Sequence, residues 1–360
     1  MKIRDRYITK TLLSYTLIVL IVWISIYSFF NFLAELNNVG KGSYSILSAF
    51  TYIILQLPEV AYKQASPIIL LGCILGMGHL ATTSQLLIFR TSGASIFKIT
   101  SLTLKNSLIF VFFFISIGEF FAPISSNFAE SSRSNALDNF STSINQDGFW
   151  IRDGDNFINV KKNIDGSLFN DITVIEVNSE NKIERVIKSE NAKFDGNSLK
   201  MTKNDIFFID GSSLIDEIIL KERNSYNKIV SFDHDLIKSL EKEPEDLSTW
   251  TLIKQIQFLS DNKLRSGVFE VELYNRLIQP LTLVAMILLA MLFIFESTRD
   301  VSLGRKIFFG VALALSFEML SRVASSLALS FDFSPFLSSI LPTIVVMSIA
   351  IILLIQKSFS

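Results

Sequence analysis

Charged residues divide the chain into three zones. They are sparse across residues 11–125 and 274–356 and dense across residues 140–272, so a polar zone separates two apolar zones. The hydrocarbon core of a bilayer is about 30 Å thick, and a helix needs about 20 apolar residues to cross it. Runs of this length predict six membrane-spanning helices, at residues 11–33, 65–81, 102–124, 274–295, 306–328 and 335–356.

The first apolar run and the segment after it need separate treatment. Residues 11–33 follow a basic stretch, as in a secretory signal peptide, but the run is longer than the apolar part of such a peptide and no A-x-A cleavage site follows. We therefore interpret it as a retained span. Residues 44–57 are too few to span a bilayer and precede Pro58, so they predict an amphipathic or half-inserted helix leading into the second span.

Lysine and arginine predict the orientation, because cytoplasmic loops are enriched in both. Six spans place both termini on one side, and that side carries Lys2, Arg4, Arg6, Lys10, Arg90, Lys98, Lys105, Arg299, Arg305, Lys306 and Lys357. The loop at 330–335 on the other side carries neither lysine nor arginine. The termini are therefore expected in the cytoplasm, and the polar zone is expected outside, in the periplasm of a cell with two membranes.

In the polar zone, short runs rich in β-branched and aromatic residues alternate with turn-forming clusters between about residues 140 and 243. The runs are N-F-I-N-V, D-I-T-V-I-E-V, E-R-V-I-K, S-L-K-M and D-I-F-F-I-D, and the clusters include D-G-D-N and F-D-G-N. This spacing favours an antiparallel sandwich, jelly roll or open barrel. Ser248 is placed to cap a short amphipathic helix that ends near Asp261 and Asn262 and leads to the fourth span.

The stretch T-T-S-Q-L-L-I-F-R-T-S-G-A-S, residues 82–95, lies between the second and third spans. Ser84 is placed to cap a helix of about eight residues, and Gly93 is placed to end it. Helical spacing puts two groups side by side, with Leu86, Phe89 and Arg90 on one face and Leu87 and Thr91 beside them. Periodicity leaves two hypotheses open: a helix lying in the membrane interface, or a helix docking into a groove on a cytoplasmic partner.

Composition and motifs add few chemical candidates. The net charge of −1 excludes the large basic surface of a nucleic-acid-binding domain, and the single cysteine, Cys73, excludes an intrachain disulfide. The G-K-G-S at 40–43 lacks the first glycine of a phosphate-binding loop, and no G-x-S-x-G is present. His79 and His234 lack metal-ligand spacing, and His79 is interpreted as a membrane-interface residue. We therefore predict no catalytic residue, no metal and no cofactor.

Several motifs together resemble those of the lipopolysaccharide export permeases, the LptF/LptG family, and are closest to its LptG branch. They cover nearly the whole chain. They are N-N-V-G-K-G-S-Y after the first span, S-Q-L-L-I-F-R-T-S-G-A-S, I-G-E-F-F-A-P, W-I-R-D-G-D-N-F-I and I-Q-P-L-T-L-V-A-M-I-L-L-A-M-L-F-I-F.

This resemblance implies an α-helical membrane protein with six transmembrane helices and an all-β, jellyroll-like periplasmic domain inserted between spans 3 and 4. The implied divisions are residues 1–125 with a cytoplasmic coupling helix at 84–92, residues 126–272, and residues 273–360. The implied function is that of a permease subunit of an ABC transporter, which extracts lipopolysaccharide from the Gram-negative inner membrane and passes it to a periplasmic bridge. The implied partners are an LptF-type permease, an LptB-type cytoplasmic ATPase dimer that hydrolyses the ATP, and an LptC-type bridge protein.

The resemblance also assigns roles to residues. The contact with the ATPase falls on Ser84, Gln85, Leu86, Leu87 and Arg90. The family commonly has a glutamate where this chain has Gln85, so hydrogen bonding is kept while charge pairing with an ATPase arginine is lost. The first and fifth spans correspond to lateral gates for the lipid. Lipid phosphates are assigned to Lys41 and Arg133, whose acidic and polar neighbours are Glu130 and Asn37.

Ionisable residues inside the predicted spans support an alternative, because charge is costly in lipid. Glu119 lies in the third span, and Glu318 and Arg322 lie at i,i+4 in the fifth. They predict either an ion relay or a self-neutralised pair facing the bundle interior or a cavity. An ion-coupled lipid transporter is therefore one alternative function, and a membrane-anchored scaffold whose β-domain binds periplasmic proteins is another.

Overall fold

The structure of the protein, a computed structural model, divides into two compact units. One unit comprises residues 1–139 and 270–360, and the other comprises residues 140–269. The structure describes residues 3–137, 149–163, 168–178, 182–196, 198–210, 217–230, 243–296, 303–331 and 333–359. Lys2, His234 and Arg299 of the sequence analysis lie outside these described residues.

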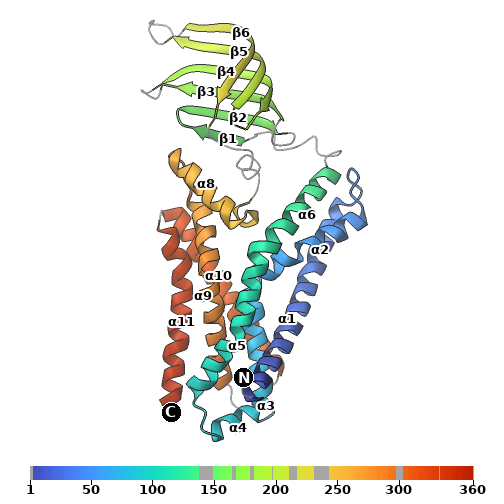
Figure 1. Ribbon diagram of the computed structural model, residues 1–360, viewed down its shortest axis with the longest axis vertical. Helices are drawn as coiled ribbons and strands as arrows, with labels where there is room; N and C mark the ends of the chain where they lie inside the picture. The colour runs from blue at the N-terminus through green and yellow to red at the C-terminus, as the bar shows by residue number, and fades with distance from the viewer. Residues whose placement is uncertain are drawn as a thin grey trace. The chain divides into compact units, whose positions relative to one another are not determined.

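The first unit is a bundle of helices (Figure 1). In its first half, α1 (Ile3–Glu35) is followed by η1 (Leu36–Asn38), α2 (Ile46–Lys63), α3 (Ala65–Thr82), α4 (Gln85–Thr91), α5 (Ile96–Ser116), η2 (Ile117–Phe121) and α6 (Ala122–Leu137). In its second half are α9 (Gly267–Glu296), α10 (Leu303–Phe331) and α11 (Pro335–Phe359). Both termini lie at the end of the bundle that carries α4 (Figure 1).

Six helical stretches among the described residues are long and apolar enough to cross a membrane. They are Arg6–Asn38, Ala65–Thr82, Ile96–Leu137, Gly267–Phe295, Gly304–Phe331 and Pro335–Ser358. The six predicted spans are thus confirmed. The third stretch is longer than predicted because α5, the π-helical η2 and α6 form one continuous helix of 42 residues.

The helix predicted at residues 44–57 is observed as α2, but it continues past Pro58 to Lys63. Ser45 and Ser48 form a reciprocal capping box that starts it, which uses two donors that would otherwise lack helical partners. A proline inside a helix costs one backbone hydrogen bond. Buried side chains before and after it, such as Ile53 and Val60, keep both halves of α2 packed in the bundle.

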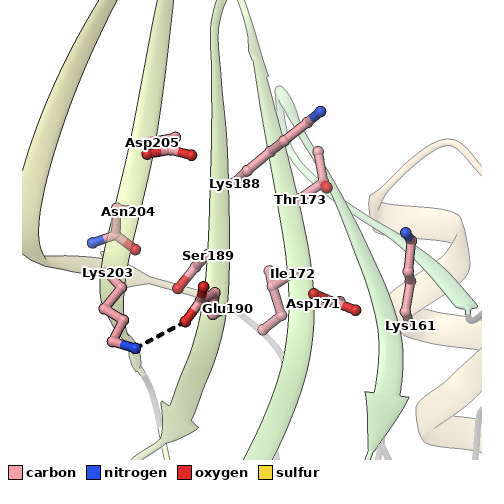
Figure 2. A pocket seen from close by; sticks show the side chains of 10 residues that line it. All are labelled: Lys161, Asp171, Ile172, Thr173, Lys188, Ser189, Glu190, Lys203, Asn204 and Asp205. Atoms are coloured by element: carbon pink, nitrogen blue, oxygen red, sulfur yellow. Dashed lines mark hydrogen bonds and ion pairs between the residues drawn. The ribbon is translucent and has the colours of Figure 1, made fainter.

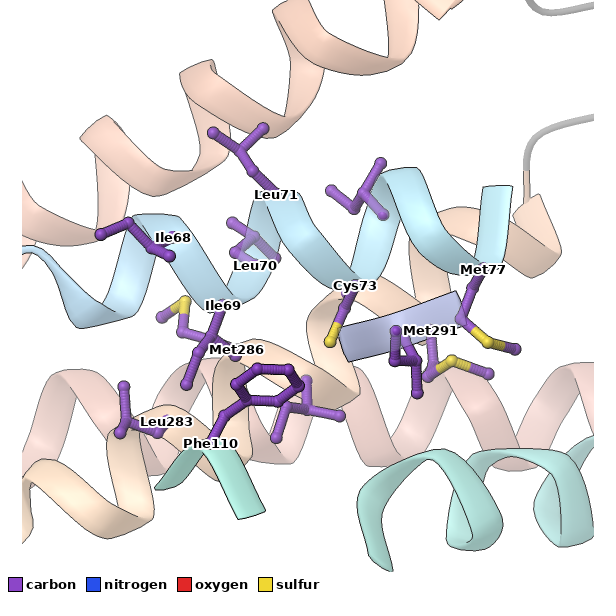
Figure 3. Close-up of a cluster of buried hydrophobic side chains, with 14 of the residues drawn as sticks. Ile68, Ile69, Leu70, Leu71, Cys73, Met77, Phe110, Leu283, Met286 and Met291 are labelled. Carbon is purple, nitrogen blue, oxygen red and sulfur yellow. The ribbon is translucent and has the colours of Figure 1, made fainter. Parts of the chain in front are cut away.

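Helix α3 occupies the centre of the bundle. In its most apolar window 72% of the residues are buried, and its side chains contact those of α5 and α9 in one large cluster (Figure 3). Lipid tails are as apolar as leucine, so helices in a membrane associate mainly through close packing at small residues. Gly72 is such a residue, because a Cβ there would lie 2.5 Å from Thr16 Oγ1 on α1.

The second unit is built on one antiparallel sheet of six described strands joined in sequential order. They are β1 (Phe149–Asp153), β2 (Asn156–Asn163), β3 (Leu168–Val177), β4 (Ile183–Phe194), β5 (Ser198–Asp210) and β6 (Glu217–Ile229). The prediction of an all-β domain inserted between spans 3 and 4 is confirmed. The predicted turns D-G-D-N and F-D-G-N hold glycines at positive φ, Gly154 and Gly196.

Two residues interrupt the alternation of buried and exposed positions along the sheet. Asp171 in β3 and Lys203 in β5 have φ of 54° and 55°, and neither is paired in the strand register. The strand register is the same on both sides of each residue, and the register shift between β3 and β4 lies instead at Glu176 and Val177. The runs S-L-K-M and D-I-F-F-I-D, predicted as separate strands, belong to one strand, β5, and Lys203 lies between them.

The inner face of the sheet holds an apolar cluster that includes Ile158, Val174 and Met201. The sheet also curls, so that β6 approaches β2 and β3. Lys228 on β6 donates to Asn156 on β2 (2.8 Å) and to Glu176 on β3 (2.5 Å). Arg185 forms a second ion pair with Glu176, and Tyr226 donates to it. This network joins β6 to β2, β3 and β4, none of which is a neighbour of β6 in the sheet.

Helix α8 (Thr249–Asp261) follows the single-turn η3 (Pro244–Asp246) and confirms the predicted connecting helix. Ser248 Oγ accepts from the Thr251 backbone nitrogen (3.1 Å), as an N-cap does. Phe258 packs against the apolar cluster of the sheet. Asn262 Oδ1 accepts from the Gly154 nitrogen (2.7 Å), so the end of α8 is tied to the β1–β2 turn.

Candidate functional site

The predicted short helix between the second and third spans is α4, and its start differs from the expectation. Ser84 stands at the predicted N-cap position, but its φ is 59° and its side chain makes no capping bond. A capping side chain reaches the first-turn nitrogens from an extended backbone, which the left-handed conformation of Ser84 does not provide. Ser84 therefore shapes the turn after α3 through its backbone.

The end of α4 is fixed as predicted at Gly93. This residue has φ of 86°, where a glycine meets no Cβ penalty. The Gly93 nitrogen donates to Arg90 O (3.0 Å) and the Ala94 nitrogen donates to Phe89 O (3.1 Å). This pair of bonds is the Schellman motif, which satisfies the last helical carbonyls and turns the chain into α5.

The two faces of α4 have different surroundings. Leu86 is 7% exposed and belongs to the core of this chain, and Phe89 packs against the same core. Leu87 and Ile88 are 41% and 61% exposed. The predicted coupling residues are therefore split: Leu86 anchors α4, whereas Leu87 and Arg90 are exposed and Ile88, which the sequence analysis did not single out, has the most exposed apolar side chain of the helix.

Gln85 lies at the first position of α4 and is half-buried. Its Oε1 atom is buried and has no hydrogen-bond partner among the residues that the structure describes. The amide oxygen of Gln85 therefore points into the interior of the chain and not to its surface.

The ionisable residues of the spans form local contacts. Arg322 Nη2 donates to Glu318 Oε1 (2.7 Å) within α10, so the predicted pair forms. The Arg322 side chain is 77% exposed on this chain, so the pair faces away from the chain's own bundle. Glu119 lies in the π-helical η2. His79 lies in α3, and the centre of its imidazole ring is 5.4 Å from the centre of the Tyr15 ring. No cluster of three metal-ligating side chains occurs in the described part of the chain.

The two predicted phosphate-binding residues are brought into one hydrogen-bonded network. Lys41 Nζ donates to Asn38 Oδ1 (3.0 Å), and Asn38 Nδ2 donates to Glu35 Oε1 (3.3 Å). The same Glu35 oxygen accepts from Arg133 Nε (2.7 Å). Lys41, in the turn after η1, and Arg133, on α6, are thus linked through two intervening side chains, Asn38 and Glu35.

A second part of the network surrounds the Arg133 guanidinium. Its central carbon lies 5.3 Å from the centre of the Tyr52 ring, within the range of a cation–π contact. Tyr52 Oη donates to Glu130 Oε1 (2.6 Å) and accepts from Gln56 Nε2 (2.7 Å). Glu130 Oε2 is 4.0 Å from Arg133 Nη1, which is too long for a hydrogen bond.

The loop between η1 and α2 holds these side chains in register. The Ser43 nitrogen donates to Ala136 O (2.8 Å) at the end of α6. Gly42 must be a glycine here, because its φ is 54° and a Cβ would lie 2.6 Å from that same Ala136 oxygen. Tyr44 is 2% exposed, and its pKa lies above its usual range because burial and the Glu35 carboxylate both disfavour the phenolate.

The β-domain carries a shallow pocket of about 440 Å³ (Figure 2). Its charged residues balance, with Lys161, Lys188 and Lys203 against Asp171, Glu190 and Asp205. Lys203 Nζ and Glu190 Oε2 form an ion pair of 3.1 Å across β4 and β5. Because neither sign of charge predominates, this pocket does not provide a field for a strongly charged ligand.

Comparison with known proteins identifies the family of this chain. The sequence model of the lipopolysaccharide export system permeases LptF/LptG matches residues 6–356. The chain belongs to this family. It is 26% identical over 359 residues to lipopolysaccharide export system permease protein LptG of Escherichia coli strain K12, covering 98% of each chain. It is 27% identical over 343 residues to the LptG protein of Haemophilus influenzae, covering 94% of each chain.

The structure identifies three residues that the sequence analysis did not single out. Glu35 and Tyr52 hold Arg133, and Ile88 enlarges the exposed surface of α4. Glu35 and Arg133 are separated by 98 positions, so no local pattern pairs them. The one available signal for Glu35 is its place at the end of a span, where a lone acidic residue needs a cation.

Proposed function

We propose that this chain is the LptG-type permease subunit of an ATP-driven transporter that moves lipopolysaccharide out of the inner membrane. The observation that carries the proposal is the exposed apolar pair Leu87–Ile88 on α4, held in place by the buried Leu86. Large apolar side chains exposed on a short, anchored helix are typical of a docking surface. We assign this surface to a separate cytoplasmic ATPase, as the LptF/LptG membership suggests.

The geometry of α4 suits the transmission of force. Its inward side chains, Leu86 and Phe89, are part of the bundle core, and its Schellman end continues directly into α5. A partner that moves α4 therefore moves α3 and α5 with it. Of the two hypotheses for this helix, an anchor in the membrane interface and a contact with a cytoplasmic partner, we therefore propose the second.

The spans assigned to the lateral gates are the least covered by the chain itself. In the most apolar windows only 6% of residues are buried in the first span and 17% in the fifth, against 72% in the second. Such spans face lipid or another subunit. We propose that α1 and α10 meet an LptF-type permease and that the lipid enters between the two chains.

Lys41 and Arg133 are proposed to hold lipid phosphate. Arg133 is near the end of α6 and Lys41 is just before α2, and these parts of the two helices lie at the end of the bundle opposite α4 (Figure 1). We assign this end to the periplasmic side from the distribution of basic residues. Arginine presents paired donors that match phosphate oxygens. The Glu35 network holds both cations beside the outer end of α1.

Energetics favour an apolar path with an external motor. Each methylene moved into water costs about 0.8 kcal/mol, so several exposed acyl chains would cost tens of kcal/mol. Non-covalent affinity saturates at roughly 20 kcal/mol, so binding alone does not extract such a lipid. We propose an LptB-type ATPase dimer as the source of free energy and an LptC-type bridge as the acceptor in the periplasm.

The test is purification of the full chain from the inner membrane in mild detergent. We expect an LptF-type permease, an ATPase and lipopolysaccharide to co-purify, and reconstituted vesicles to release lipopolysaccharide only when ATP is hydrolysed. ATP hydrolysis by the isolated chain would contradict the proposal. So would export that continues without the ATPase and stops when the proton gradient is dissipated, because that result favours the ion-coupled alternative.

A further inference from the structure

Two carboxylates flank Arg133, and their surroundings differ. The Glu35 side chain is 10% exposed and touches the guanidinium at Nε, at 2.7 Å. The Glu130 side chain is 42% exposed and lies 4.0 Å from Nη1. Glu35 is thus buried and hydrogen-bonded to Arg133. Glu130 is exposed and interacts with Arg133 electrostatically, at a distance too long for a hydrogen bond.

The buried carboxylate determines how both cations are presented. Glu35 uses one oxygen, Oε1, to accept from Arg133 Nε and from Asn38 Nδ2, and Asn38 in turn accepts from Lys41 Nζ. The Tyr52 ring covers the guanidinium plane. Because Nε is engaged by Glu35, an incoming anion would bind Nη1 or Nη2, and the Tyr44 hydroxyl also lies near this guanidinium.

The exposed carboxylate lies near Nη1, one of the two nitrogens to which an anion would bind. Glu130 is held near Nη1 by the Tyr52 hydroxyl at 2.6 Å rather than by the guanidinium itself. It lies at i−3 from Arg133 on the same helix. A phosphate oxygen can form the short, charge-assisted bond to Nη1 that Glu130 does not form.

We propose that Glu35 is a positioning residue for both cations and that Glu130 is a resident anion that a lipid phosphate displaces from Arg133. This inference rests on the proposed phosphate site at Lys41 and Arg133. Displacement of a built-in carboxylate keeps lipid binding weak enough for release to the next protein. The same balance of entry and exit governs any conduction pathway with binding sites.

The test compares two lipid probes bound to the full chain in its purified complex. One is a hexa-acylated diglucosamine 1,4′-bisphosphate, and the other is the same lipid after enzymatic removal of both phosphates. The measured quantity is the ratio of the two affinities, which reports phosphate recognition. A variant that merely misfolds lowers both affinities and leaves the ratio unchanged.

Opposite signs are expected for the two glutamates. Glu130→Gln should raise the ratio about two- to fivefold, the size of one exposed ion pair. Glu35→Gln should lower the ratio about tenfold, because two cations lose their orientation. Glu190→Gln removes another exposed, paired glutamate, in the β-domain, and should leave the ratio unchanged.

The outcomes separate this inference from the proposed function. A wild-type ratio near one, or a ratio unaffected by Arg133→Met, would overturn the phosphate site and this inference with it. A ratio that falls with Arg133→Met but does not rise with Glu130→Gln overturns the inference alone. A Glu35→Gln variant that weakens both probes equally assigns Glu35 a purely structural role and overturns its positioning role.

Discussion

Arg133 and Glu35, 98 positions apart in the chain, form an ion pair in which Nε lies 2.7 Å from Oε1. The pair joins α6 to the C-terminal end of α1. Glu35 is only 8% exposed, so its carboxylate depends on neighbouring donors for the interactions that it loses with water.

The two members of this pair should contribute to the stability of the helical bundle in a coupled way, so that their separate losses do not add. Arg133→Met leaves a nearly buried carboxylate without its cation, and we expect a loss of roughly 1–3 kcal/mol. The double variant Glu35→Gln with Arg133→Met should lose less than the sum of the single losses. Thermal unfolding of the four proteins in detergent measures this coupling, and strictly additive losses would contradict it.

The exposed side chains of α4 should control association with the ATPase. A charge at Leu87 or Ile88 places a carboxylate in an apolar contact, so Leu87→Asp and Ile88→Asp should abolish co-purification of the ATPase while the bundle still folds. Ile183→Asp makes the same change at an exposed site of the β-domain and should have no effect. Full recovery of the ATPase with Leu87→Asp would contradict the docking role of α4.

The close approach of α1 and α3 should make Gly72 intolerant of a methyl group. A Cβ at this position would lie 2.5 Å from Thr16 Oγ1 and 2.8 Å from the Thr16 Cα, so Gly72→Ala must push the two helices apart. We expect a loss of about 1–3 kcal/mol, as for other overpacked sites. Gly304→Ala is the matched control, because a Cβ at Gly304 would meet no atom within 4 Å. The apparent Tm should fall for the first variant and not for the second.

The stability of the β-domain around the Glu176 network should decrease in acid. Burial favours the neutral form of Glu176, but Lys228 and Arg185 outweigh it and hold the pKa of this carboxyl below its usual range. A folded-state pKa below the unfolded one adds stability above the ordinary glutamate pKa of about 4.3, and this stability is lost as the pH falls through the folded-state value.

Hydrogen exchange of the β3 and β6 amides, corrected for intrinsic rates, measures this effect in the full chain. Protection should decrease as the pH falls below the ordinary glutamate pKa of about 4.3 in the wild type and change much less in Glu176→Gln. Asp195→Asn is the control, because Asp195 pairs with Lys200 at an exposed site, where solvent screens the interaction. Equal pH profiles for wild type and Glu176→Gln would exclude this carboxyl as the cause.

The fold was largely predictable because its signals are local. Each of the six spans is a long apolar run, and the turns at Gly154 and Gly196 are marked by D-G pairs. The continuation of α2 past Pro58 was not predictable, since packing in the bundle offsets the local cost of proline. Strand β6 was also missed, because its segment E-I-I-L-K-E-R-N-S-Y-N-K-I is mostly polar after its first residues.

The candidate site was predictable only in part. Leu86 to Phe89 are four consecutive apolar residues of α4, and together they point to all sides of the helix. Periodicity therefore does not tell which of them face the core. The structure separates the buried Leu86 from the exposed Leu87 and Ile88. The partners of Arg133 come from α1 and α2, and pairs between distant segments leave no local pattern in one sequence.

One helix connects the two regions to which function is assigned. The stretch from Ile96 to Leu137 begins beside the short helix that bears Leu87 and carries Arg133 near its far end. Its 42 residues extend for about 60 Å, twice the hydrocarbon thickness of a bilayer. In the proposed transporter, a tilt of this helix by about five degrees about the end next to α4 would displace its far end by about 5 Å. A small movement at α4 would then become a displacement of several bond lengths beside Arg133.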